Sequence, residues 1–146
     1  MNIDITTDIA APAALVWATI SDVERWPEWT ASVTSVRRLD SGLLRVGSQA
    51  EIKQPAFPKV VWTVTELVDG TTFSWEARSP GLYSLASHTV TGDEHNASIR
   101  LGISQTGRLE GVSRALFGKR SVRYVQMEGA GIKARCEGAL PATPTL

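Results

Sequence analysis

GVSRALFGKRSVRYVQMEGAGIKARCE, residues 111–137, is the one part of the chain with the pattern of a single long helix. Small or apolar residues recur along it at spacings of three and four, which is the period of one face of an α-helix. The face consists of Ala115, Gly118, Val122, Val125, Gly129, Ile132 and Cys136. No proline interrupts the run before Pro141. We therefore expect one long helix of roughly 40 Å, at a rise of about 1.5 Å per residue.

Two residues on this face, Gly118 and Gly129, carry no side chain. Glycine costs about 1 kcal/mol relative to alanine in a helix interior. A helix that keeps such residues either packs closely against a neighbour or leaves room for something. The sequence favours the second interpretation, in which both glycines roof a cavity.

The residues before this helix predict a curved sheet. A first strand is expected at Asn2–Ala10, followed by a short helix that begins near Pro12 and a second one near Val23–Trp26. The indoles of Trp26 and Trp29 are expected to close one end of the core or, alternatively, to wall a pocket. Six further strands follow, joined mostly by short turns, at residues 31–39, 44–52, 59–68, 71–78, 82–91 and 97–106. Hairpin connections make such a sheet antiparallel, and twist curls it.

Composition and charge set limits on function. The 146 residues suit a single domain, expected at 1–138, with a frayed tail at 139–146. No signal peptide or membrane span is apparent, so we expect a cytoplasmic protein. Basic residues are spread around the last helix of a chain with no net charge, which indicates a solvated face rather than a nucleic-acid or membrane surface. Cys136 has no partner for a disulfide, no metal site is expected, and no cofactor is indicated.

Segments near both ends of the chain are similar to those of a known family. They are Ile9-Ala10-Ala11-Pro12, Val16-Trp17, Ile20-Ser21-Asp22, Trp26-Pro27-Glu28-Trp29 and Glu128-Gly129-Ala130-Gly131-Ile132-Lys133. In them the chain resembles the START-like (SRPBCC) superfamily, and within it the polyketide cyclase/dehydrase-like group. The resemblance implies an α+β helix-grip fold, with a seven-stranded antiparallel sheet wrapped around the C-terminal helix and an apolar cavity between them. It also implies lipids, sterols, hormones or polyketides as ligands, with enzymes among the members.

The candidate site is chosen by chemistry and strand parity. His88 shares the parity of Ala86 and Val90, so it is expected to point into the cavity, where it could transfer protons as the catalytic residue. A histidine held by a neighbour, or one that faces solvent, is the plainer alternative. Glu128 is interpreted as part of a surface ion pair. The predicted ligand-binding residues are Phe57, Trp62, Trp75, His88, Leu101, Phe117, Val125 and Met127.

Three functions stay open on this basis. The favoured one is binding of a small hydrophobic molecule, such as a lipid or polyketide, between sheet and helix. The second is a polyketide cyclase or dehydratase that uses acid–base catalysis in the same cavity. The third is a co-chaperone-like interaction module, which needs a large exposed apolar patch that the sequence does not predict. We expect no nucleic acid and no stable membrane insertion, and a homodimer through an outer strand is left open.

Overall fold

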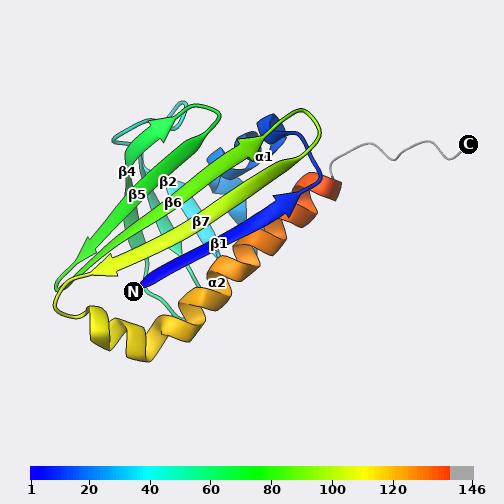
Figure 1. The fold of residues 1–146 in the computed structure, drawn as a ribbon. Helices are drawn as coiled ribbons and strands as arrows, with labels where there is room; N and C mark the ends of the chain where they lie inside the picture. The colour runs from blue at the N-terminus through cyan, green and yellow to red at the C-terminus, as the bar shows by residue number, and fades with distance from the viewer. Residues whose placement is uncertain (139–146) are drawn as a thin grey trace, which may run out of the picture.

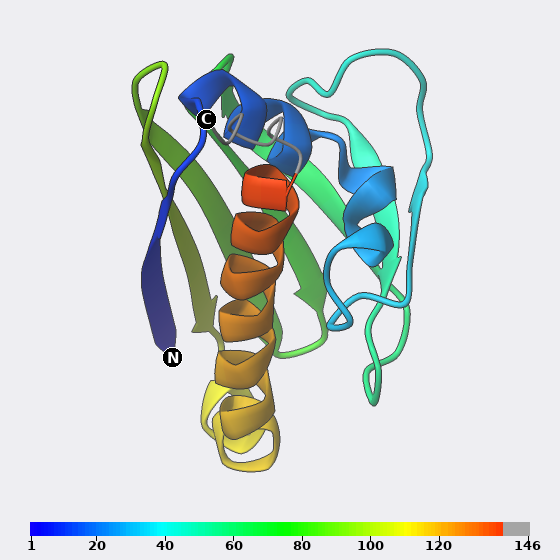
Figure 2. The same ribbon diagram turned by 90° about the vertical axis from the view of Figure 1, so that its right-hand side faces the viewer.

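Seven antiparallel strands form one curved sheet, and the long helix α2 lies across its concave face (Figures 1 and 2). The computed structural model describes residues 1–138, so the predicted tail at 139–146 lies outside the described residues. The strands follow the order β1-β7-β6-β5-β4-β3-β2 across the sheet. The elements are β1 (Asn2–Ile9), α1 (Ala13–Ser21), the 3₁₀ helix η1 (Val23–Glu28), β2 (Ser35–Arg38), β3 (Gln49–Lys53), β4 (Val60–Val68), β5 (Thr72–Ser79), β6 (Leu82–Gly92), β7 (Ala97–Thr106) and α2 (Glu110–Gly138).

The predicted helix-grip architecture is confirmed. The helix α2 extends one residue beyond the predicted range at each end, and β7 has the predicted bounds. The central strands pair as the hairpin signals indicate, with β5 against β6 and β6 against β7. No helix within residues 1–138 has both the length and the apolar composition that a membrane crossing requires.

Two strands are shorter than the sequence pattern indicates. β2 ends before Leu39, and β3 begins only at Gln49, because the loop between them folds onto Asp40. The Asp40 carboxylate accepts hydrogen bonds from the Gln49 backbone amide and the Ser48 hydroxyl, each at 2.9 Å. The amide of Gln49, together with Ser48 and Arg38, lowers the pKa of Asp40 to about 2. The polar loop therefore replaces the strand that the apolar residues of 44–48 suggested.

The two short helices cover one end of the sheet, beside the C-terminal part of α2 (Figure 2). α1 buries Val16 and Ile20, and the buried indole N–H of Trp26 in η1 donates to the Ile20 carbonyl at 3.0 Å. The second helix continues through Pro27 rather than ending at Trp26 as expected. It does so as a 3₁₀ turn, in which the Trp26 carbonyl accepts the Trp29 amide.

The glycines of α2 do not roof a cavity, contrary to the prediction. A Cβ on Gly129 would lie 2.7 Å from the Thr7 hydroxyl oxygen of β1, so the helix backbone packs directly on the sheet there. A Cβ on Gly118 would make ordinary contacts, the nearest at 3.5 Å to the Arg114 side chain. The tightest approach is at Gly131, where a Cβ would lie 2.1 Å from the backbone oxygen of Trp29. Small residues therefore bring α2 close to β1 and to the turn that follows η1.

Candidate functional site

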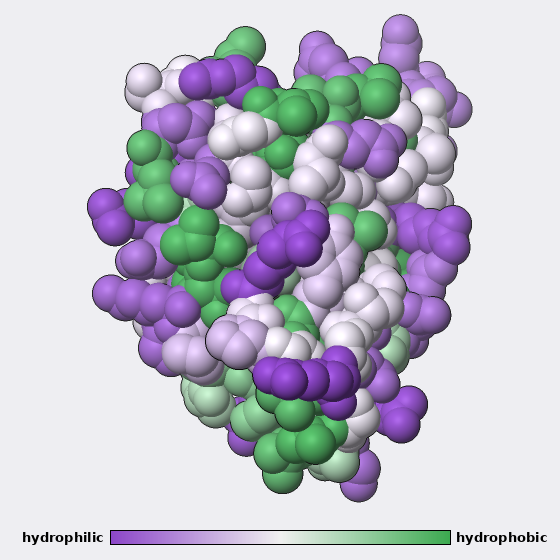
Figure 3. Space-filling view, turned by 90° about the vertical axis from the view of Figure 1, so that its left-hand side faces the viewer, coloured by the Kyte–Doolittle hydropathy of each residue, from purple (hydrophilic) through white to green (hydrophobic). Residues whose placement is uncertain are grey.

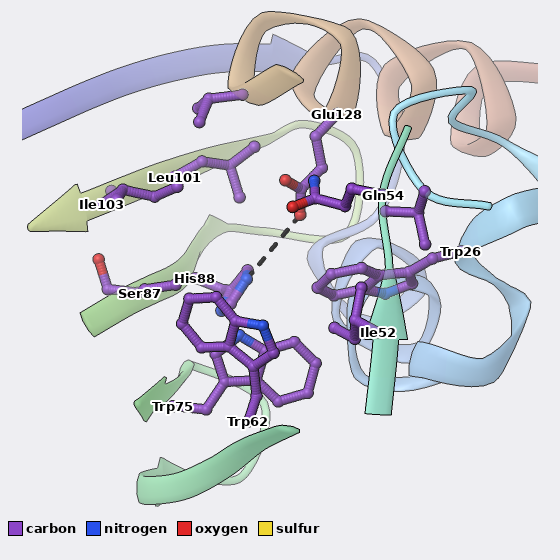
Figure 4. Close-up of a pocket in the computed structure, with 14 residues that line it drawn as sticks. Trp26, Ile52, Gln54, Trp62, Trp75, Ser87, His88, Leu101, Ile103 and Glu128 are labelled. Carbon is purple, nitrogen blue, oxygen red and sulfur yellow. Dashed lines mark ion pairs between the residues drawn. The ribbon is translucent and has the colours of Figure 1, made fainter. Parts of the chain in front are cut away.

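A narrow cavity lies between the inner face of the sheet, η1 and α2 (Figure 4). Its volume is about 50 Å³. Most of its wall is apolar, with His88 and Glu128 as the two titratable groups. The lining residues are Trp26, Val33, Ile52, Gln54, Trp62, Trp75, Ala86, Ser87, His88, Leu101, Gly102, Ile103, Val125 and Glu128.

His88 is held in the wall of this cavity by its neighbours on the sheet. It lies in β6 opposite Phe73 of β5 and Leu101 of β7. Its imidazole stacks on the Phe73 ring, with 4.2 Å between the centroids and 14° between the planes. Nδ1 lies 3.1 Å from the Phe73 carbonyl oxygen. Because a carbonyl oxygen only accepts, Nδ1 carries the proton, and the lone pair of Nε2 faces the cavity.

Glu128 enters the same cavity from α2. It follows Val125 by three residues and precedes Ile132 by four, so it lies on the buried face of the helix. Its Oε1 atom is buried and has no hydrogen-bond partner within residues 1–138. Burial raises the pKa of the Glu128 carboxyl to about 8, since the charged form loses its hydration. Glu128 is therefore a largely protonated acid at neutral pH, and the prediction of a surface ion pair is wrong.

The His88 and Glu128 side chains face each other across the cavity (Figure 4), with 3.9 Å between Nε2 and Oε1. The two groups do not form an ion pair, because both are neutral. Burial lowers the pKa of His88 to about 4, against the smaller opposing effect of the Phe73 carbonyl, so the proton stays on Glu128. The separation is too long for a direct hydrogen bond, which needs about 3 Å. Two hydrogen bonds of about 2.8 Å through one oxygen atom can bridge it.

Three indoles surround the pair and keep its environment apolar. Trp26, Trp62 and Trp75 all line the cavity. Trp26 lies 5.5 Å and Trp75 lies 5.8 Å from His88, measured between ring centroids. Trp26 therefore combines both expected roles, because it is part of the core and also lines the cavity. Trp29 packs against the core without lining the cavity.

Three of the predicted ligand-binding residues lie outside the cavity lining. Phe57, in the β3–β4 loop, packs against Phe117 and Tyr124 of α2, with centroid distances of 5.4 and 5.5 Å. The Tyr124 hydroxyl donates to the Pro55 carbonyl of the same loop. These contacts fasten the loop to the helix beside the cavity. Met127 is partly buried and does not line it either.

The other five predicted residues, Trp62, Trp75, His88, Leu101 and Val125, line the cavity together. Their role in binding or catalysis stays a prediction. Sequence reasoning missed Glu128, although its spacing from Val125 and Ile132 could have placed it on the buried face. It also missed Gln54, whose loop position carries no periodic signal. Within residues 1–138, no group of three or more His, Cys, Asp or Glu side chains comes together as a metal site.

Comparison with known proteins assigns the chain to a family. A family described as polyketide cyclase / dehydrase and lipid transport matches residues 1–137. The chain belongs to this family. No curated protein matches the sequence. The match includes every residue that lines the cavity. The family description covers both catalysis and lipid transport, so it does not by itself distinguish an enzyme from a binding protein.

Solved structures share the fold of this cyclase/dehydrase and lipid-transport family member. The Zhui aromatase/cyclase from Streptomyces sp. R1128 aligns with a TM-score of 0.68 at 16% identity, over 92% of this chain and 94% of that one. A START superfamily protein from Mycobacterium smegmatis aligns with a TM-score of 0.74 at 13% identity, over 95% and 99%. The protein TTHA0849 from Thermus thermophilus aligns with a TM-score of 0.76 at 16% identity, over 97% of this chain and 100% of that one. At such identities the likeness concerns the fold alone.

Proposed function

We propose that this protein binds a small cyclic, largely apolar molecule that carries one hydroxyl or carbonyl group. The ring lies among the indoles of the cavity, and its oxygen lies between Glu128 and His88. A hydroxyl accepts the proton of the Glu128 carboxyl and donates its own to Nε2 of His88. The family of polyketide cyclases, dehydrases and lipid-transport proteins supports a ligand of this general class.

The observation that carries the proposal is the buried carboxyl of Glu128. An unpaired polar group in a protein interior costs about 1–3 kcal/mol. Here Oε1 has no hydrogen-bond partner within residues 1–138. The Nε2 lone pair of His88 faces the same space at 3.9 Å. One ligand oxygen can form a hydrogen bond with both groups. Such a ligand would offset the cost of placing two polar groups in an otherwise apolar wall.

The size of the cavity limits the ligand. Drug-sized molecules occupy pockets of roughly 300–1,000 Å³, whereas this cavity measures about 50 Å³. A single ring is therefore a better match than a long acyl chain, although a cavity that holds benzene measures roughly 150 Å³. Even a single ring thus requires the cavity to widen, which movement of the β3–β4 loop away from α2 provides. Ala56 in that loop has a positive φ of 67°, a conformation that costs energy in a non-glycine residue.

Calorimetric titration with phenol, a single ring with one hydroxyl, tests the binding proposal. We expect saturable binding to the wild type and about tenfold weaker binding to Glu128→Leu, equivalent to about 1.4 kcal/mol. Glu128→Gln keeps a hydrogen-bond donor and should bind almost as the wild type does. Glu51→Leu removes a carboxylate that pairs with Arg37 and Lys59 rather than lining the cavity, so it serves as the matched control. Equal affinities for the wild type and Glu128→Leu would refute the proposal.

Acid–base catalysis is a second candidate, because an unprotonated imidazole nitrogen and a protonated carboxyl face each other at 3.9 Å. His88 is a base in its neutral form, and Glu128 is an acid in its neutral form. With a bound ketone, Nε2 of His88 accepts a proton from the carbon next to the carbonyl, while Glu128 protonates the carbonyl oxygen, which yields an enol. Reversal of both transfers restores the ketone. The same two transfers, with Glu128 protonating a β-hydroxyl that leaves as water, dehydrate a β-hydroxy ketone.

Exchange of the α-protons of cyclohexanone in deuterated water, followed by proton NMR, measures this chemistry without knowledge of the natural substrate. We expect the wild type to exceed the buffer rate. His88→Gln and Glu128→Gln should each lower the protein-catalysed rate roughly 100-fold, a typical contribution of one acid or base. Glu128→Gln is expected to bind phenol almost as the wild type does. If this variant loses proton exchange but still binds phenol, Glu128 acts in catalysis and not only in binding. If the wild type exchanges protons no faster than buffer, the catalytic function is rejected and the binding function remains.

A further inference from the structure

The N-terminal half of α2 buries none of its side chains. All buried residues of this helix lie at Tyr124 or later, namely Tyr124, Val125, Gly129, Ile132 and Cys136. In Figure 1 this half of α2 reaches past the lower end of the sheet. We refer to residues 108–123 as the amphipathic segment. Its apolar side chains therefore have no partner in the core.

Apolar side chains nevertheless recur on the outer face of this segment. Leu109, Val112 and Leu116, at helical spacings of three and four, are 44%, 55% and 69% exposed. Leu116 and Val125 are nine residues apart, which places them about 180° apart around the helix at ~100° per residue. The outward face is thus apolar over the first turns of α2, where an ordinary surface helix is polar. The basic residues Lys119, Arg120 and Arg123 follow Leu116 on the same side of the helix. Figure 3 shows hydrophobic side chains gathered beside strongly hydrophilic ones at this lower end of the molecule.

Positive charge surrounds the apolar stripe. The amphipathic segment has five basic residues and one acidic residue, Glu110. Glu110 is already engaged by the N-terminal amine at 2.6 Å and by Arg114 at 3.7 Å. The remaining cations form no ion pair with another residue of the range 1–138. They are Arg108, Lys119, Arg120 and Arg123. This end of the molecule thus offers unneutralised positive charge next to exposed leucine and valine side chains.

We propose that the amphipathic segment docks this protein on an anionic membrane surface. Leu109, Val112 and Leu116 enter the boundary between headgroups and acyl chains, and the flanking arginine and lysine side chains reach the lipid phosphates. A nucleic acid offers no apolar layer for the leucines. A second copy of the chain brings the same positive charge to the contact, which opposes self-association. An anionic lipid surface complements both features at once.

This proposal replaces the expectation of a merely solvated basic face, because exposed leucine and valine side chains lie beside the cations. It goes beyond ligand binding and can fail independently of it. The apolar stripe lies on the face of α2 opposite Val125, which lines the cavity. The docked orientation keeps the β3–β4 loop near the bilayer, because Phe57 of that loop contacts Phe117 of the segment. A ring molecule dissolved in the acyl region would then have a short path to the loop that covers the cavity.

Flotation with unilamellar vesicles tests the docking. We expect the wild type to float with vesicles of equal parts phosphatidylcholine and phosphatidylglycerol, and to stay unbound with pure phosphatidylcholine. The double variant Val112→Ser/Leu116→Ser and the double variant Arg120→Gln/Arg123→Gln should each reduce the bound fraction roughly tenfold or more, since each cation adds substantially to the attraction. Raised salt should weaken wild-type binding.

The matched controls alter the same residue types elsewhere. Leu43→Ser changes a leucine that is 90% exposed in the β2–β3 loop, at the opposite end of the molecule from the start of α2 (Figure 2). Arg37→Gln changes an exposed arginine of β2. Both should float as the wild type does, and all variants should titrate phenol as the wild type does. Absence of wild-type flotation, equal flotation of the segment variants, or a dimer in light scattering that Leu116→Ser abolishes would each overturn the proposal.

Discussion

Replacing Glu128 with glutamine should abolish a decline in stability that the wild type shows between about pH 6.5 and pH 8. The Glu128 carboxyl has a pKa of about 8 in the folded protein and an ordinary value of 4.5 when unfolded. Between these values the folded state holds a proton that the unfolded state releases. The free energy of unfolding therefore falls as pH rises through this window.

His88 acts in the opposite direction over part of the same range. Its pKa is about 4 in the folded protein and 6.5 when unfolded, so the unfolded state holds the extra proton between these values. Its contribution is complete above the unfolded pKa and is lost as pH falls. Between pH 4.5 and 6.5 the two slopes cancel. Above pH 6.5 only Glu128 contributes, and the loss amounts to about 2 kcal/mol by pH 8, at ~1.4 kcal/mol per pH unit.

Urea denaturation at a series of pH values measures this effect. In Glu128→Gln the free energy of unfolding should stay level from pH 6.5 to 8, because the titrating group is gone. In His88→Gln the decline should instead begin near pH 4.5, where the unfolded glutamate ionises. Glu51→Gln changes a carboxylate on the outer side of the sheet and should keep the wild-type slope. A decline that persists in Glu128→Gln would show that another group titrates there, and that the carboxyl is not held neutral.

Gly131→Ala should destabilise the protein by roughly 3 kcal/mol, at the upper end of overpacking effects. The added methyl group would lie 2.1 Å from the backbone oxygen of Trp29 and 3.2 Å from an atom of its indole ring. A backbone carbonyl cannot rotate away as a side chain can. Either α2 moves outward or the turn after η1 shifts. Both movements disturb the packing of Trp26, which contacts the Trp29 ring at 5.9 Å between centroids.

Gly118→Ala is the matched control on the same helix. Its methyl group would meet the Arg114 side chain at 3.5 Å and the Met1 sulfur at 3.7 Å, which are ordinary contacts. This variant should therefore gain up to about 1 kcal/mol from helix propensity. Urea denaturation monitored by tryptophan fluorescence gives both values. Similar stabilities for the two alanine variants would mean that the close approach of α2 to Trp29 is absent in solution.

The architecture was predictable because its signals are local. The alternation of β7 and the spacings of three and four in α2 each follow from which side chains can be buried together within one element. The parity of His88 with Ala86 and Val90 likewise predicts an inward direction, and His88 is 3% exposed. The predictions failed where a contact between residues distant in the sequence determines the local structure. The carboxylate of Asp40 folds residues 44–48 into a loop, and Thr7 of β1 occupies the space that Gly129 leaves.

The order of strands and helices, the long closing helix and the presence of one inward histidine could all be inferred from the sequence. These properties depend on side-chain period, on proline and glycine, and on hairpin turns, all of which act over a few residues. That Glu128 shares a cavity with His88, and that the apolar side chains at the start of α2 stay exposed, depends instead on tertiary packing. The reason is geometric. Forty residues separate His88 from Glu128 in the chain, and only the position of α2 on the curved sheet brings Oε1 to 3.9 Å from Nε2.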